Sequence, residues 1–266
     1  SESFKKQIEE SGQNLLIRGY KEVDGEEYID PGYTEWGASG LAAVWAENNT
    51  RESIYNAFRR KETFATTGSR IKVRFFGGYN IQDAFSEEDP VSYAYSKAVT
   101  MGSDILQSEE SVPQFIVWAL RDIKRAPLDR VQIIKGWTEL SGKPHERIYD
   151  VACSDGRKPD SKTNLCKATR ASVNVKNCKV SKNYGANELK AIWEDPDFDA
   201  ELKAFYYVRV LENPTCRWST WDAIKSGDKP RDDLPATIQE RAWSSPIWYV
   251  PDNDGITVSN ILPEDI

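Results

Sequence analysis

Histidine is almost absent from this sequence, because its 266 residues include only His145. One imidazole cannot supply a histidine-based metal cluster, and it makes a His-dependent catalytic triad hard to build. His145 lies in the segment GKPHERIYD, where we expect an exposed side chain with a structural role. The chain as given is therefore expected to hold no catalytic residue, no metal ligand and no cofactor of its own.

Long apolar runs and an excess of positive charge are also missing. No segment is long and apolar enough to cross a bilayer, and the first ten residues, SESFKKQIEE, lack the apolar core of a signal peptide. The formal net charge is -7. Nucleic acids and anionic membranes bind basic surfaces, so neither is expected as a partner. The sequence lacks an initial Met and contains only Met101, which indicates a processed or excised piece of a longer protein.

Cysteine is scarce, but the positions of the four cysteines are informative. Three of them fall in one polar stretch of the second half, and none forms the short Cys-x-x-Cys knuckle of a zinc site. An even number of cysteines in a region with few apolar residues predicts two disulfides and an oxidising compartment. Free thiols are the alternative. The candidates are Cys153, Cys166, Cys178 and Cys216.

A helix signal passes directly into a strand signal within residues 44–76. Asn49 is placed to cap a helix, and Glu52 completes a capping box three residues later. After an Ala-Thr-Thr-Gly turn, the apolar period changes from 3.6 to 2. This change predicts a helical or irregular lead-in over residues 1–69, including a short amphipathic helix near the N-terminus, and a β domain over residues 70–266.

Strand signals recur through the second region at intervals typical of a sandwich. We expect no parallel α/β sheet, because helices do not alternate with these strands. The predicted fold is mainly β, an antiparallel, immunoglobulin-like β-sandwich preceded by a short helical segment. Strands are predicted at 70–77, 114–121, 129–137, 146–152, 171–175, 188–194, 204–212 and 242–250, and long loops at 83–96 and 154–170.

The turn that follows the predicted helix is a candidate anion site. Its hydroxyl groups, backbone N–H groups and guanidinium are the groups that hold anions in proteins. The alternative is a structural entry into the strand, with Gly68 at positive φ. The candidate residues are Thr66, Thr67, Ser69 and Arg70.

Aromatic residues suggest a second candidate site around the segment CRWSTWD. Exposed tryptophans on a sandwich bind flat ligands such as sugar rings, whereas alternate aromatic residues usually fill a core. The candidate ligand platform is Arg217, Trp218 and Trp221. Two acidic segments are expected to be ordinary turns: residues 195–199 a solvated one, and residues 252–255 a tight one that lacks the glutamate of a calcium loop.

Several long, ordered blocks between Gly40 and Tyr249 together resemble the C-terminal half of the bacterial DUF3604 family. They include GLAAVWAENNTRESIYNAFRRKETFATTGSRIKVRFFGGY, VQIIKGW, YDVACSDGR, AFYYVRVLENPTCRWSTWDA and TIQERAWSSPIWY. The family looks like a relative of the PHP (polymerase and histidinol phosphatase) metallohydrolases of the carbaryl-hydrolase-like type, which are typically exported. The resemblance implies an N-terminal barrel-like domain, with His-x-His and Asp-x-His metal ligands, ahead of a helix, an Ala-Thr-Thr-Gly turn and a β-sandwich.

None of those metal ligands is found in this sequence, so the resemblance implies that a divalent metal is held by a missing N-terminal domain. We therefore expect the C-terminal, non-catalytic part of a periplasmic or secreted, phosphoesterase-like hydrolase. The N-terminal PHP-like domain, or a second copy of the chain, would cover the apolar face of residues 41–58. The alternative is an autonomous ligand-binding or carbohydrate-binding β-sandwich.

Overall fold

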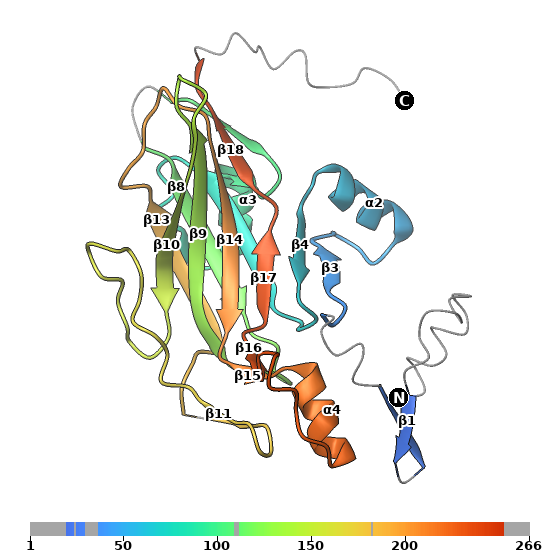
Figure 1. Ribbon diagram of the computed structural model, residues 1–266. Coiled ribbons are helices and arrows are strands. Elements are labelled where there is room, and N and C mark those ends of the chain that lie inside the picture. The colour runs from blue at the N-terminus through green and yellow to red at the C-terminus, as the bar shows by residue number, and fades with distance from the viewer. Residues whose placement is uncertain (1–19, 24, 30–36, 109–111, 182, 253–266) are drawn as a thin grey trace. The chain divides into compact units, whose positions relative to one another are not determined.

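The computed structural model of the protein describes five stretches of the chain, drawn in colour in Figure 1: residues 20–23, 25–29, 37–108, 112–181 and 183–252. The chain divides into two compact units. The larger unit consists of Gly40–Arg170, Tyr184–Asn213 and Glu240–Ile266, and the smaller one of Ser1–Ser39, Ala171–Asn183 and Pro214–Gln239. None of the helices in the described stretches is long and apolar enough to span a bilayer.

An eight-stranded sheet is the main element of the larger unit. Its strands run in the order β10-β9-β14-β17-β4-β3, with β18 beside β14 and β7 beside β18. All of its pairings are antiparallel except the one between β18 and β7. The strands are β3 (Leu41–Val44), β4 (Thr63–Thr66), β7 (Asp104–Leu106), β9 (Leu128–Thr138), β10 (Pro144–Cys153), β14 (Ala204–Glu212), β17 (Arg241–Ser244) and β18 (Ile247–Val250).

A four-stranded antiparallel sheet packs against the first one. Its order is β13-β8-β5-β6, with β5 (Lys72–Gly78), β6 (Val99–Thr100), β8 (Gln114–Leu120) and β13 (Glu188–Glu194). Side chains alternate across each strand, so Tyr206 and Val208 of β14 enter the core and Phe205 and Tyr207 lie on the outer face. The rings of Phe115 in β8 and Tyr206 meet across the core with centroids 4.4 Å apart.

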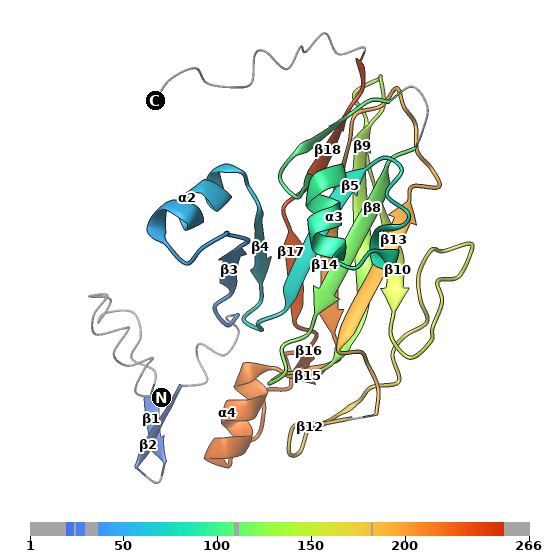
Figure 2. The same ribbon diagram turned by 180° about the vertical axis from the view of Figure 1, so that it is seen from behind.

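Two α-helices lie among the described residues of this unit. Helix α2 (Arg51–Arg59) connects β3 to β4, and its cap is Thr50, whose Oγ1 accepts a hydrogen bond from the Ser53 N–H at 3.2 Å. The predicted cap, Asn49, is therefore wrong by one residue. Helix α3 (Pro90–Lys97) covers the outer face of the four-stranded sheet (Figure 2) and packs on β5 and β6. Within this unit, the outer face of the eight-stranded sheet carries no helix in the described residues (Figure 1).

The smaller unit contains three short strand pairs and helix α4 (Trp218–Ser226). The helix ends at Gly227, whose φ of 75° is the left-handed conformation that glycine adopts without strain. The pairs are β1 (Tyr20–Val23) with β2 (Glu26–Ile29), β11 (Val173–Asn174) with β12 (Lys179–Val180), and β15 (Thr215–Cys216) with β16 (Thr237–Ile238).

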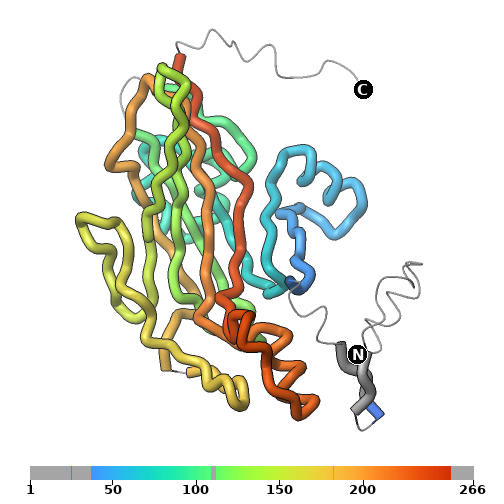
Figure 3. Tube along the Cα trace, viewed as in Figure 1, coloured from blue at the N-terminus to red at the C-terminus, as the bar shows by residue number. Residues whose placement is uncertain are grey.

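The mainly β, antiparallel character that the sequence predicts is confirmed, and the loop at 154–170 appears in yellow in Figure 3. Two predictions are wrong: residues 83–96 contain α3 and a 3-10 turn at Ala84–Ser86, and 242–250 is broken into β17 and β18. The sheet also extends across the predicted boundary after residue 69, because β3 and β4 belong to it. The immunoglobulin-like topology stays a prediction, and the N-terminal amphipathic helix lies outside the described residues.

Candidate functional site

The donors of the predicted anion turn bind groups of the chain itself. The Thr66 hydroxyl donates to the Ser69 carbonyl oxygen at 2.6 Å, and the Thr67 hydroxyl donates to the Glu240 carboxylate. The Arg70 N–H donates to Asp122 Oδ2 at 2.9 Å. Of the four candidate side chains, that of Arg70 is the most exposed. Gly68 has a positive φ of 120°, as expected if the turn serves only as a structural entry into the strand. Anion binding at this turn stays a prediction.

Three carboxyl groups surround this turn and set its electrostatics. The buried Glu212 has its pKa raised to about 8, first by burial and then by the charges of Glu240 and Asp122, although the neighbouring Ser69 hydroxyl opposes the shift. Burial also acts on Asp122, but the N–H groups of Arg70 and Lys124 hold its pKa below the ordinary value. An anion at this turn would therefore depend on the exposed Arg70 guanidinium.

The second predicted site, at the start of α4, is only partly exposed. Arg217 is buried and donates to Ser219 Oγ at 2.5 Å. Its guanidinium lies 5.5 Å from the ring of Trp218, which is half-buried. Trp221 is 40% exposed. Among the described residues, neither tryptophan belongs to the two core clusters of buried residues, and ligand binding at this platform stays a prediction.

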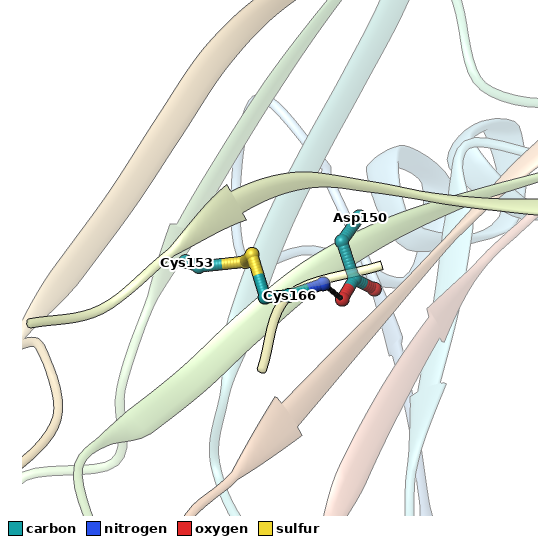
Figure 4. Close-up of side chains that lie close together, drawn as sticks. All are labelled: Asp150, Cys153 and Cys166. Carbon is teal, nitrogen blue, oxygen red and sulfur yellow. Dashed lines mark hydrogen bonds between the residues drawn. A yellow bond between two sulfur atoms is a disulfide. The ribbon is translucent and has the colours of Figure 1, made fainter. Parts of the chain in front are cut away.

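All four cysteines form disulfides, as predicted, with the pairs Cys153–Cys166 and Cys178–Cys216. Within the described stretches, one group of three potential metal ligands lies together: Asp150, Cys153 and Cys166 (Figure 4). Its two sulfur atoms are bonded to each other, whereas metal binding requires thiolates. The Asp150 carboxylate accepts hydrogen bonds from the Cys166 N–H and from Gln132 Nε2, both at 2.6 Å. This group therefore does not fit a metal.

Removing the first disulfide tests its contribution to stability. The sequence separation of Cys153 and Cys166 is 13 residues. Closing a loop of this length lowers the entropy of the unfolded chain, so Cys153→Ser/Cys166→Ser should reduce the free energy of unfolding by about 3 kcal/mol. Urea unfolding of the variant and of the oxidised wild type measures the difference. Equal unfolding midpoints at equal slope would show that the bond contributes no stability.

Two other sequence predictions need correction. His145 is half-buried rather than exposed: its Nε2 lies 2.6 Å from Glu139 Oε1, and its ring stacks on Trp137 at 5.1 Å. The predicted solvated turn at 195–199 is wrong for its first residue. Asp195 is buried and forms an ion pair with Lys135 at 2.5 Å.

The sequence did not predict a pocket of about 500 Å³ lined by Trp45, Glu62, Arg74 and Tyr95. The Arg74 guanidinium lies 3.6 Å from the ring centroid of Trp45 and donates to the Tyr95 hydroxyl at 3.0 Å. Tyr95 in turn donates to the buried carboxylate of Glu62, and burial together with that carboxylate raises the pKa of Tyr95. The pocket therefore already holds a cation between its rings.

A second unpredicted pocket, of about 470 Å³, lies at one end of the eight-stranded sheet. Its lining includes Trp137 of β9, Phe205 of β14 and Trp248 of β18. The rings of Phe205 and Trp248 lie on the outer face of the sheet, whereas the Trp137 ring stacks on His145 and packs against the core. The aromatic residues of 204–212 and 242–250 were visible in the sequence. Their common position depends on strand register, which joins segments about 70 and 40 residues apart and is not a local signal.

The profile of one protein family, described as "Protein of unknown function (DUF3604)", matches residues 3–251 of the chain. No curated protein and no solved structure is significantly similar to it.

Proposed function

The chain belongs to the DUF3604 family, and we propose that it is the C-terminal, non-catalytic β portion of an exported, PHP-like, metal-dependent hydrolase. On this proposal an N-terminal PHP-like domain holds the divalent metal and cleaves a phosphate or another ester. The present chain supplies a docking surface and side chains beside the substrate. The two disulfides are consistent with an extracytoplasmic protein and support a periplasmic or secreted location.

The observation that carries the proposal is an exposed apolar surface on β3 and α2. The side chains of Leu41, Tyr55 and Phe58 are 44%, 59% and 51% exposed. Large apolar side chains that gather at a surface mark contacts with other proteins. This is the segment that the family resemblance places against the metal-binding domain.

Charge favours that domain over a second copy of the chain. Residues 51–61 contain four basic side chains and one acidic side chain. A symmetric dimer through α2 would bring two such basic segments together, and like charges facing one another weaken association. A partner with acidic residues around an apolar patch complements this surface.

A binding experiment tests the docking surface. The 266-residue chain should be monomeric by light scattering and should bind the separately purified metal-binding domain. Phe58→Ser should weaken that binding at least tenfold, whereas Ile123→Ser, at a side chain that is 81% exposed elsewhere, should leave it unchanged. A wild-type dimer that Phe58→Ser dissociates, or an absence of binding to the domain, would contradict the proposal.

The predicted anion turn gives a kinetic test in the protein that contains both parts. If Arg70 steadies a substrate anion or a transition-state oxygen, Arg70→Ala should lower turnover about tenfold or more. The thermal midpoint should not change, because this side chain is exposed. Lys72→Ala removes another exposed cation two residues away and is the control. Unchanged kinetics in Arg70→Ala would remove the turn from the site.

The second candidate function is an autonomous module that binds carbohydrate or another ligand through Arg217, Trp218 and Trp221. The exposure of Trp221 favours it, whereas the burial of Arg217 leaves a small platform. A glycan and peptide screen that follows tryptophan fluorescence tests this candidate. Binding that Trp221→Ala abolishes would support it.

A further inference from the structure

We propose that the pocket of Trp137, Phe205 and Trp248, called here the β14 pocket, binds a saccharide. It uses residues that belong neither to the turn at 66–70 nor to α4. The proposal goes beyond the hydrolase role and does not depend on it. The volume of the β14 pocket, about 470 Å³, lies within the range of about 300–1,000 Å³ that is usual for small-ligand sites.

Strand pairing places two of the aromatic rings side by side on the outer face of the sheet. Phe205 of β14 lies opposite Trp248 of β18, and their ring centroids are 5.1 Å apart. The ring of Tyr207, two residues along β14, is nearly parallel to that of Phe205, at 6.3 Å and 15°. The indole of Trp248 is 47% exposed. The three rings therefore form a row on a face that carries no helix among the residues of this unit that the structure describes (Figure 1).

A glycine on the neighbouring strand lets the central ring lie against the sheet. Phe205 pairs with Gly136 of β9, and a Cβ atom at Gly136 would stand 2.2 Å from Cζ of the Phe205 ring. An overlap of that size would force the Phe205 ring to shift away from β9. Gly136 thus leaves the space in which the Phe205 ring lies over β9.

Side chains that donate hydrogen bonds and side chains that accept them line the same pocket. Asp104 of β7 lies beside Trp248 in the parallel pairing of β7 and β18. The Thr138 N–H at the end of β9 donates a hydrogen bond at 3.4 Å to the carbonyl oxygen of Lys203, the residue before β14. Lys61 completes the set. Lysine donates hydrogen bonds, a carboxylate accepts them, and a threonine hydroxyl does both.

This combination suits a sugar better than an apolar molecule. A pyranose presents a face of C–H groups, which the negative face of an aromatic ring attracts, and an edge of hydroxyl groups that need both donors and acceptors. A purely apolar ligand would leave Asp104, Thr138 and Lys61 without compensation for lost water. The site is also unlike the pocket of Trp45, in which Arg74 already lies over the ring.

Titration calorimetry of the intact chain tests the proposal with four probes: cellohexaose, xylohexaose, maltohexaose and tetragalacturonate. At least one probe should bind. Tetragalacturonate is the only acidic probe, so comparing it with the three neutral ones shows whether the pocket selects for charge or for the shape of the sugar ring. Trp248→Ala should weaken that binding about tenfold or more and leave the thermal midpoint unchanged, because the side chain is half exposed. Ile123→Ala, at a side chain that is 81% exposed and outside the pocket, is the control and should bind as the wild type does. Loss of binding in Trp221→Ala would instead place the probe at α4.

Gly136→Ala provides a second variant, one that removes no aromatic side chain. It should weaken binding as Trp248→Ala does, because the added methyl group displaces the Phe205 ring. The proposal is overturned if none of the four probes binds, if both Trp248→Ala and Gly136→Ala bind as the wild type does, or if Trp221→Ala alone abolishes binding.

Discussion

Lys135→Met is expected to lower the free energy of unfolding by about 3–5 kcal/mol. Lys135 Nζ lies 2.5 Å from Asp195 Oδ2, and the two side chains are only 4% and 0% exposed. Tyr206 donates to the same carboxylate oxygen at 2.7 Å, and burial together with Asp195 raises the pKa of Tyr206. Methionine fills the space of lysine but leaves the Asp195 charge buried without its cation. Urea unfolding at pH 7 measures the loss.

An exposed ion pair of the same length provides the control. Arg147 Nη1 lies 2.5 Å from Asp197 Oδ2, but these side chains are 48% and 45% exposed. Water screens that pair, so Arg147→Met should cost less than about 1 kcal/mol. The double variant Lys135→Met/Asp195→Asn should regain part of the loss, since no buried charge remains. Equal losses in Lys135→Met and Arg147→Met would show that burial does not decide the effect.

Glu212 is expected to make the protein less stable as the pH rises. Burial, followed by the charges of Glu240 and Asp122, raises its pKa from 4.5 to about 8 in the folded state. Between these values the folded state holds a proton that the unfolded state has lost. The stabilisation is complete below pH 4.5 and is lost as the pH rises through 8. The total effect of this group is about 5 kcal/mol, at about 1.4 kcal/mol for each unit of pKa shift.

Glu212→Gln isolates this effect, because glutamine keeps the shape of the protonated acid and does not ionise. The variant should gain stability relative to the wild type as the pH increases from 5 to 9, measured by urea unfolding at each pH. Glu146→Gln, at an exposed carboxylate on β10, should leave the difference constant. A Glu212→Gln variant whose stability runs parallel to that of the wild type would contradict the raised pKa.

The long strands were predictable from local pattern, whereas α3 and the break in the last strand were not. Strands β8 and β14 match their predicted ranges within one residue because apolar side chains continue or alternate throughout them. Helix α3 was missed although Asp89 caps it and Pro90 occupies its first turn, a common start for a helix. The break between β17 and β18 coincides with Pro246, which cannot donate a hydrogen bond to a sheet.

The candidate sites show the same division between local and non-local information. The cysteine pattern predicted the disulfides, because the composition shows that the loop has too few apolar side chains to be stabilised by a hydrophobic core. The carboxyl groups around the turn at 66–70 come from positions 122, 212 and 240, which no local pattern connects to it. The β14 pocket likewise depends on the register of Phe205 against Gly136 and Trp248.

Hydrolysis of bis(p-nitrophenyl) phosphate in the presence of Mn²⁺ tests the proposed division of labour most directly. The 266-residue chain should show only the background rate and no stoichiometric Mn²⁺ binding, whereas the product of the complete reading frame should bind the metal and turn over. If the chain by itself binds one equivalent of Mn²⁺ and hydrolyses the ester with turnover, the catalytic centre lies within these residues and the proposed function is wrong.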